Sequence, residues 1–156
     1  MAKNNLVLDI VNEILAQSFP IVNKVISEKL ISGDFVNIFP KTVEERKLLI
    51  RDISKLGKII SKLDNGDIYL LNKPIPTQFG DYSLIKVRIF DPTRTERGAP
   101  DFKVEKYDSF KKKYSGKEGF TLLDKGNFEV IELKVSGANV RIYFPSETLS
   151  ESLSLK

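Results

Sequence analysis

The side chains available for chemistry in this chain are amines, guanidinium groups, carboxylates, amides, hydroxyls and phenols, because its 156 residues include no histidine and no cysteine. Histidine is the commonest general base and transition-metal ligand, and the cysteine thiolate is a frequent nucleophile and zinc ligand. The composition therefore excludes histidine-dependent charge-relay triads, histidine or thiolate metal sites, cysteine nucleophiles and disulfides. The acidic pair Glu44-Glu45 is explained by helix capping, so no carboxylate dyad for hydrolysis stands out.

Candidate binding residues follow from the alternation of side chains along the predicted strands, which places every second residue on the same face. Lys86 and Arg88 lie opposite an unbroken row of β-branched residues that is suited to packing under helices. Arg141 and Tyr143 likewise lie opposite an apolar row in the last strand. The second face gathers the candidate ligand-binding residues, which are Asn37, Lys86, Arg88, Lys103, Glu132, Arg141 and Tyr143.

This second face suits an anionic, partly aromatic small molecule. Arginine offers a planar fork of donors that holds a carboxylate or phosphate through two hydrogen bonds, and we expect Arg88 and Arg141 to approach each other across one anion. Phe35, Phe39 and Phe90 fall among the polar residues and would stack on a planar ligand. The competing interpretation is a solvated face, on which lysine and arginine keep an open antiparallel sheet in solution.

Two further clusters give weaker signals. The loop 93–98 carries two arginines and a glycine, but it lacks the strand–loop–helix context of a phosphate-binding P-loop, which favours a solvated loop. The lysine run 111–113 lies between Tyr107 and Tyr114 and could contact RNA or membrane phosphates, although a polar helix face gives the same pattern and is favoured. The net charge of +4 permits acidic partners without requiring them.

The helices that position these strands are indicated by apolar residues at helical spacing. Residues 5–31 predict an N-terminal helical segment, which we expect Pro20 to kink or divide and Gly33 to end. Its apolar face is expected to pack on the core or on a second subunit. Thr42 and Glu45 have the spacing of a capping box, which predicts the start of the next helix.

The remaining elements are predicted from short alternating runs and from turn residues. Asn65-Gly66 is typical of a tight hairpin turn, and the Pro-rich stretch 73–76 predicts a loop. A short helix is predicted over 107–114, and the Ser-rich tail 146–156 is expected to fray. The predicted strands are 35–39, 58–63, 67–73, 83–90, 101–104, 120–124, 128–135 and 140–144.

The order of elements repeats, because each half of the chain contains a strand, a helix and three further strands. Asp34-Phe35 opens the first half and Asp101-Phe102 the second, and the stretch 87–90 matches 140–143 in the final strands. The expected fold is α+β: two βαβββ modules form a curved mixed sheet with helices on its outer face, preceded by an N-terminal helical segment. The predicted boundaries are an extension over 1–33, a paired domain over 34–146 with modules 34–91 and 100–146, and a flexible tail over 147–156.

This paired βαβββ pattern resembles the vicinal oxygen chelate superfamily, which includes glyoxalase I, ring-cleaving dioxygenases, and the bleomycin and fosfomycin resistance proteins. The resemblance implies a cup with helices outside and the ligand inside. Catalytic members carry histidine and glutamate metal ligands on the first and last strands of each module. Those strands mostly offer cations here, which would repel a divalent metal, so the non-metal binders of the superfamily are the nearer analogues. The residues at those strands are Asn37, Lys86 or Arg88, Lys103, and Arg141 or Tyr143.

The leading functional hypothesis is therefore a small-molecule binding protein with an anionic ligand, no metal and no cofactor. One alternative is a metal-independent isomerase or lyase, in which Lys86 or Lys103 acts as a base and Tyr143 donates a proton. Another is an interaction protein that assembles through its N-terminal helices, as in a homodimer, or contacts nucleic acid. Neither nucleic acid nor a membrane is favoured as a partner, and the lack of cysteine and of an export signal predicts a cytoplasmic location.

Overall fold

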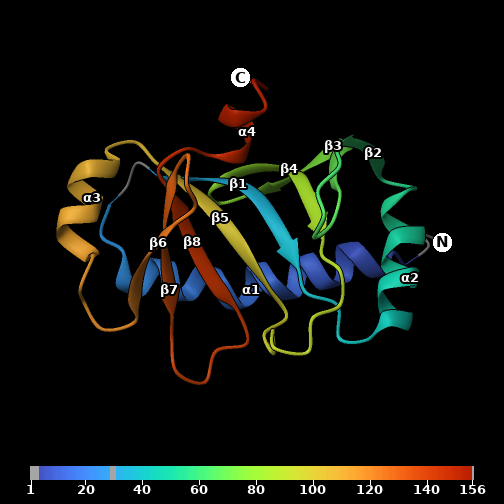
Figure 1. Cartoon of the computed structure of the whole chain (residues 1–156), viewed down its shortest axis with the longest axis horizontal. Helices are drawn as coiled ribbons and strands as arrows, with labels where there is room; N and C mark the ends of the chain where they lie inside the picture. The colour runs from blue at the N-terminus through green and yellow to red at the C-terminus, as the bar shows by residue number, and fades with distance from the viewer. Residues whose placement is uncertain (1–3, 29–30, 156) are drawn as a thin grey trace.

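A computed structural model of the chain describes residues 4–28 and 31–155 and shows an α+β fold around one eight-stranded mixed sheet (Figure 1). The helices are α1 (Leu6–Val25), α2 (Val43–Ile53), α3 (Tyr107–Tyr114) and α4 (Leu149–Ser152). The strands are β1 (Ile31–Ile38), β2 (Gly57–Ser61), β3 (Ile68–Thr77), β4 (Gly80–Val87), β5 (Gly98–Val104), β6 (Phe120–Asp124), β7 (Glu129–Lys134) and β8 (Arg141–Pro145). The sheet order is β2-β3-β4-β1-β5-β8-β7-β6, which confirms the predicted fold class.

The repeated strand pattern is confirmed by how the strands pair. The first and last strands of each half are parallel neighbours, β1 with β4 and β5 with β8, and the two halves join through the antiparallel pair of β1 and β5. The sequence match between 87–90 and 140–143 is nevertheless out of register. Arg88 follows the end of β4, whereas Arg141 is the first residue of β8, so the two arginines lie at opposite ends of equivalent strands.

Helices α1, α2 and α3 cover one face of the sheet, and the apolar rows of the strands pack beneath them. One core cluster joins α1 and α2 to the first half of the sheet and includes Ile85 and Val87. The other joins α1 and α3 to the second half and includes Ile142 and Phe144. Ile89, by contrast, is 45% exposed, because β4 ends before it. In Figure 1, α1 runs behind the sheet, while α2 and α3 lie at its two ends.

The N-terminal segment forms one continuous helix, so the expectation that Pro20 would divide it is wrong. Pro20 cannot donate a hydrogen bond to the carbonyl of Ala16, but both residues lie on the exposed face, where water reaches that carbonyl. The helix ends at Val25 rather than near Gly33, which belongs to β1 instead. A Cβ atom on Gly33 would lie 2.2 Å from Cε1 of Tyr82, so close approach rather than helix ending requires glycine there.

Of the described helices, α1 is the one long and apolar enough to cross a membrane by length and composition alone. The core helix of a folded domain meets the same criteria. The apolar residues of α1 contribute to both core clusters, so its composition is explained by packing against the sheet.

The Pro-rich stretch 73–76, predicted as a loop, continues β3 and pairs with β4 beyond an irregularity after Leu70. Ile75 is paired with Tyr82, and Pro76 with Asp81. Proline is tolerated there because β2 pairs with β3 only as far as Leu71, which leaves the rest of β3 at the edge of the sheet.

The tail was expected to fray, but part of it forms α4. Thr148 and Glu151 make a complete capping box: the Thr148 hydroxyl accepts from the Glu151 amide, and the Glu151 carboxylate accepts from the Thr148 amide. The amide of Ser150 also donates to Asp34 Oδ2 at 3.3 Å, which holds this short helix against β1. The Ser-rich composition therefore did not prevent order in the described part of the tail.

Candidate ligand-binding site

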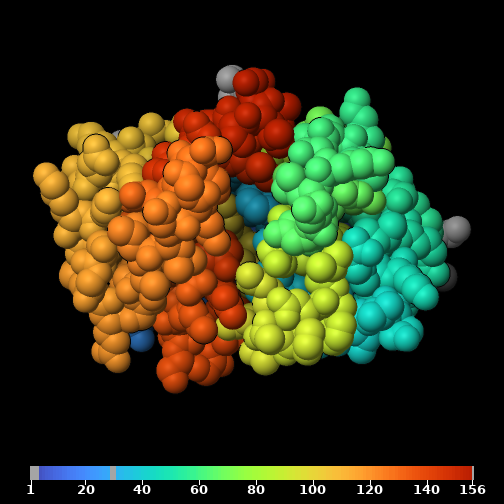
Figure 2. Space-filling model, viewed as in Figure 1, coloured from blue at the N-terminus to red at the C-terminus, as the bar shows by residue number. Residues whose placement is uncertain are grey.

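The face of the sheet opposite α1 is hollowed between the two halves, and a cavity of about 420 Å³ lies in the hollow. Figure 2 shows this hollow between the orange and red segments of the second half and the green segments of the first. Both halves and the C-terminal tail line the cavity. Its apolar walls include Phe35, Leu63, Ile68, Phe128, Val130 and Leu149.

The floor of the cavity is built from two pairs of residues, one pair in each half of the sheet. The members of each pair lie opposite each other on neighbouring strands. Asn37 of β1 is paired with Lys86 of β4, and Asp101 of β5 is paired with Tyr143 of β8. Asn37, Lys86 and Asp101 are each 7% exposed. Asn37 Oδ1 and Asp101 Oδ1 are buried without a hydrogen-bond partner in the described structure. Such groups are costly to bury alone, and they give a largely apolar cavity a polar floor.

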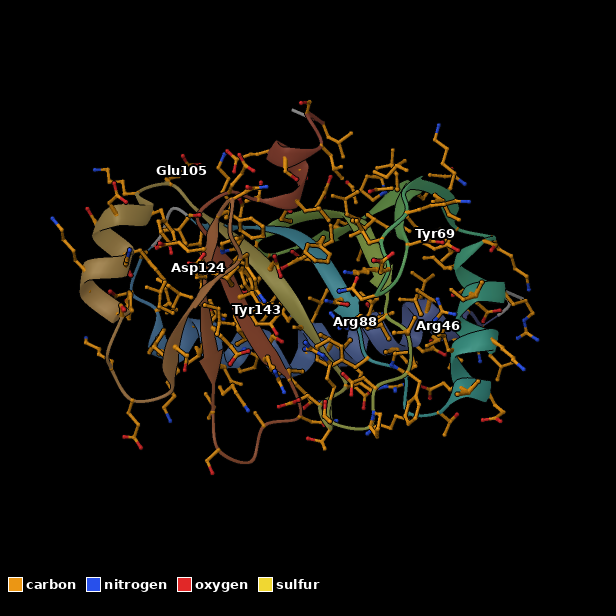
Figure 3. The ribbon with its side chains drawn as sticks, in the orientation of Figure 1. Arg46, Tyr69, Arg88, Glu105, Asp124 and Tyr143 are labelled. Atoms are coloured by element: carbon orange, nitrogen blue, oxygen red, sulfur yellow. The ribbon has the colours of Figure 1, made fainter. Side chains whose placement is uncertain are left out.

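Arg88 and Arg94 add two guanidinium groups to the cavity wall. The Arg88 Nε atom is buried and has no hydrogen-bond partner in the described structure, and burial and the nearby charge of Arg94 lower the pKa of Arg88. Arg94 lies over the Phe39 ring, 5.1 Å from its centroid. Arg46 Nε donates to the carbonyl of Arg88 at 3.1 Å and so fixes the backbone just after β4. Figure 3 shows Arg88 and Tyr143 on opposite sides of the central hollow.

Burial shifts the protonation of the floor residues. Lys86 has its pKa lowered to about 8, first by burial and then by the charges of Arg88 and Arg94. Burial, followed by repulsion from Asp34, raises the pKa of Asp101 well above its ordinary value. The floor therefore disfavours both the ammonium form of Lys86 and the carboxylate form of Asp101, which is the pattern expected of a site that can exchange protons.

The tail closes one side of the cavity. Glu147, Leu149, Ser152 and Leu153 all line it, although this segment was expected to be flexible. An ion pair between Lys103 Nζ and Glu151 Oε2, at 3.5 Å, connects the tail to β5. Helix α4 is therefore in a position to influence how a ligand enters.

The structure brings four of the predicted site residues together at the cavity, namely Asn37, Lys86, Arg88 and Tyr143. Lys103, Glu132 and Arg141 do not line it. Arg141 Nε lies 3.0 Å from Glu96 Oε1, and Arg141 Nη1 donates to Glu132 Oε2 at 3.4 Å. The expectation that Arg88 and Arg141 face one anion as two unpaired guanidinium groups is therefore wrong.

Several cavity residues were missed by the sequence analysis, above all Asp101 and Arg94. Asp101 lies two residues before Lys103, so strand alternation already places it on the same face as that predicted residue. The composition of the loop 93–98 predicts a solvated loop, and no local pattern indicates that Arg94 lines the cavity. Asn65 and Lys125, each from a turn between strands, are further polar residues of the lining.

The donor set of the cavity floor does not fit a divalent metal. It consists of one amide, one amine, one carboxyl group and one phenol, with two arginines nearby. No group of three or more acidic side chains that could hold a metal ion occurs in the part of the chain that the structure describes. A single carboxyl group surrounded by cationic side chains would not compensate for the dehydration of such an ion.

Comparison with known proteins identifies the fold but no family. No family model matches the chain, and no curated protein matches it. A solved structure described as "Structural Genomics, Protein EC4020" is similar over 100% of this chain and 98% of that chain, with a TM-score of 0.73. The fold is shared. At 10% sequence identity the similarity extends to the fold alone.

Proposed function

We propose that this protein binds a small organic anion with an aromatic body inside the cavity, without a metal, as the non-metal binders of the vicinal oxygen chelate superfamily do. The observation that carries the proposal is the half-buried Arg88 guanidinium, which lines a largely apolar cavity and has no hydrogen-bond or ion-pair partner among the described residues. A partly desolvated charge without a partner is costly, and an anionic ligand would relieve that cost.

The balance of charge in the cavity favours an anion. Four basic side chains outnumber the two acidic ones, Asp101 and Glu147, and the pKa of Asp101 is raised. The basic residues are Lys86, Arg88, Arg94 and Lys125. Hydrogen bonds between guanidinium and carboxylate or phosphate are about twice as strong as hydrogen bonds between neutral groups. They are stronger still in a cavity that excludes water, because the local dielectric constant is low. A carboxylate held by Arg88 would thus have a large advantage over a neutral ligand of the same shape.

The size and walls of the cavity support an aromatic body for the ligand. A volume of about 420 Å³ lies within the range of small-molecule sites. Phe35 and Phe128 lie on opposite halves of the wall, so a planar ring between them would have apolar contacts on either side.

The proposal is tested by thermal unfolding in the presence of phosphate and of a panel of aromatic and aliphatic carboxylates. A carboxylate present at about a hundred times its dissociation constant should stabilise the wild-type protein by about 2.7 kcal/mol. Arg88→Met should lose this response. Arg141→Met is the matched control, because it removes an arginine of the same sheet face that is paired and lies outside the cavity. Unchanged responses in Arg88→Met, or no response of the wild-type protein to any anion, would contradict the proposal.

A second candidate function is acid–base catalysis without a metal, and the lowered pKa of Lys86 favours it. In that function Lys86 removes a proton from a carbon acid while Tyr143 donates one to the neighbouring oxygen. Exchange of ligand carbon-bound hydrogen for deuterium, followed by NMR, should occur with the wild-type protein and cease in Lys86→Met.

The interaction function suggested by the N-terminal helix and the lysine run receives less support. The apolar face of α1 is already packed in the core. Lys111 Nζ lies 2.9 Å from Glu129 Oε2, and Lys113 Nζ lies 3.4 Å from Glu28 Oε2. These features thus have partners within the chain.

A further inference from the structure

The Lys86 side chain combines burial with the absence of a partner. This residue is 7% exposed and lines the cavity, and no hydrogen bond or ion pair involves its amine among the described residues. Structural lysines in a protein interior are normally paired, because an isolated buried ammonium ion is strongly disfavoured. The amine of Lys86 is therefore unlike that of an ordinary structural lysine.

The backbone of Lys86 is held on both sides. It is paired with Asn37 of β1 and with Ile68 of β3, near the middle of the sheet. A group mounted on a central strand has a well-defined position relative to the rest of the site, which is what a reacting atom requires. The same cavity holds Arg88, two residues further along the chain, and the charge of Arg88 contributes to the lowered pKa of Lys86, so the two basic groups are close to each other.

We propose that Lys86 forms a covalent imine with a 2-oxo acid that carries an aromatic side chain. This inference rests on the proposed function, since Arg88 holds the carboxylate of the oxo acid while the ring occupies the apolar part of the cavity. The adjacent carbonyl carbon then lies toward the Lys86 amine. An amine, a guanidinium group and an apolar wall match the three parts of such a molecule: carbonyl, carboxylate and ring.

The reaction balances without an oxidant or reductant. The neutral Lys86 amine adds its electron pair to the carbonyl carbon, which forms a C–N bond and gives a carbinolamine after proton transfer. The carbinolamine oxygen then takes up a proton and leaves as water while the C=N bond forms. Imine formation therefore consumes one oxo acid and releases one water molecule, and hydrolysis reverses it.

The reaction requires a neutral amine and a proton donor, and the cavity favours the neutral form of Lys86 and the protonated form of Asp101. The pKa of Lys86 is lowered to about 8, so a substantial share of the amine is neutral in mildly basic solution. The pKa of Asp101 is raised well above its ordinary value by burial, which favours the protonated carboxyl group. Asp101 can therefore donate the proton that the departing water requires.

The test incubates the full chain with phenylpyruvate and sodium cyanoborohydride, which reduces an imine to a stable amine, and locates the adduct by peptide mass spectrometry. The adduct adds the mass of the oxo acid less one oxygen atom. We expect one predominant adduct per chain, on Lys86. Lys86→Met should abolish it, whereas Lys58→Met, which removes an exposed lysine of β2, should leave it unchanged.

Phenyllactate separates this inference from the proposed function, because it has the same ring and carboxylate but no carbonyl group. Thermal stabilisation of the wild-type protein and of Lys58→Met by phenyllactate, with no predominant adduct on Lys86, would overturn the imine and leave anion binding intact. Failure of phenyllactate and phenylpyruvate to stabilise the protein, together with adducts spread over surface lysines, would overturn both. Mapping the adduct on the wild-type chain decides the question even if Lys86→Met does not fold.

Discussion

The Arg141 Nε atom lies 3.0 Å from Glu96 Oε1, and this contact connects the start of β8 to the loop before β5. Burial would raise the pKa of Glu96, but the ion pair with Arg141 holds that pKa below its ordinary value. Arg141→Met leaves both Glu96 and Glu132 without this partner, and loss of a charged partner costs about 1–3 kcal/mol of unfolding free energy. Urea unfolding measures the loss. A variant as stable as the wild-type protein would show that the contact contributes nothing.

The buried amine of Lys86 predicts how stability depends on pH. Its pKa in the folded protein is about 8 and that of an unfolded lysine is 10.5, so between these values the unfolded chain binds more protons. Stability should therefore rise with pH across this window, by about 2–3 kcal/mol between pH 7 and pH 10.

Lys86→Met removes this contribution while keeping much of the side-chain volume. Urea unfolding of the wild-type protein and of Lys86→Met from pH 7 to pH 10 measures this contribution. The other titrating groups affect both proteins equally, so they cancel in the difference between the two free energies of unfolding. If that difference does not change with pH, the Lys86 pKa is close to its ordinary value in the folded protein.

The capping box of α4 predicts a separate effect of the tail on ligand binding. Thr148→Val removes the hydroxyl that accepts from the Glu151 amide and should destabilise α4 by about 1 kcal/mol. Because Leu149 and Leu153 line the cavity, stabilisation by a bound carboxylate should decrease. Hydrogen exchange of residues 147–155 should quicken in the variant without ligand. Unchanged ligand affinity together with faster hydrogen exchange would show that the tail does not contribute to ligand binding.

The donor set of the cavity predicts that the purified protein holds no stoichiometric zinc, iron, nickel, copper or manganese. The chain has no histidine and no cysteine, and the one carboxyl group on the cavity floor lies among cationic side chains. Elemental analysis after gentle purification measures the content. About one such ion per chain would contradict the expectation and require ligands outside the described cluster.

Local signals predicted those parts of the fold that depend on neighbours in sequence. Alternation placed Lys86 and Tyr143 opposite apolar rows, and both line the cavity. The antiparallel hairpin of β2 and β3 is confirmed, but the loop 62–67 joins the strands, and its turn closes through a hydrogen bond from the Gly66 amide to the Leu63 carbonyl rather than as a tight turn centred on Asn65-Gly66. The Thr42 cap is also confirmed, although the Glu45 carboxylate accepts from the amide of Lys41 rather than of Thr42.

The parts that were missed depend on residues far apart in the chain. Arg88 and Arg141 have the same local sequence pattern, but only Arg141 meets the side chain of Glu96, which comes from a distant loop. The tail differs, since the capping box of Thr148 and Glu151 is a local signal that was outweighed by Ser-rich composition. The ion-pair partners of charged residues could therefore be identified only in the structure, whereas α4 could have been predicted from the sequence.

The most direct test of anion binding is a crystal structure of the protein with phenyllactate. We predict one molecule in the cavity, with its ring against the apolar wall formed in part by Phe35 and a carboxylate oxygen within hydrogen-bond distance of the Arg88 guanidinium group. An empty cavity at saturating phenyllactate, or a ligand whose carboxylate points to solvent and makes no contact with Arg88, would contradict the account.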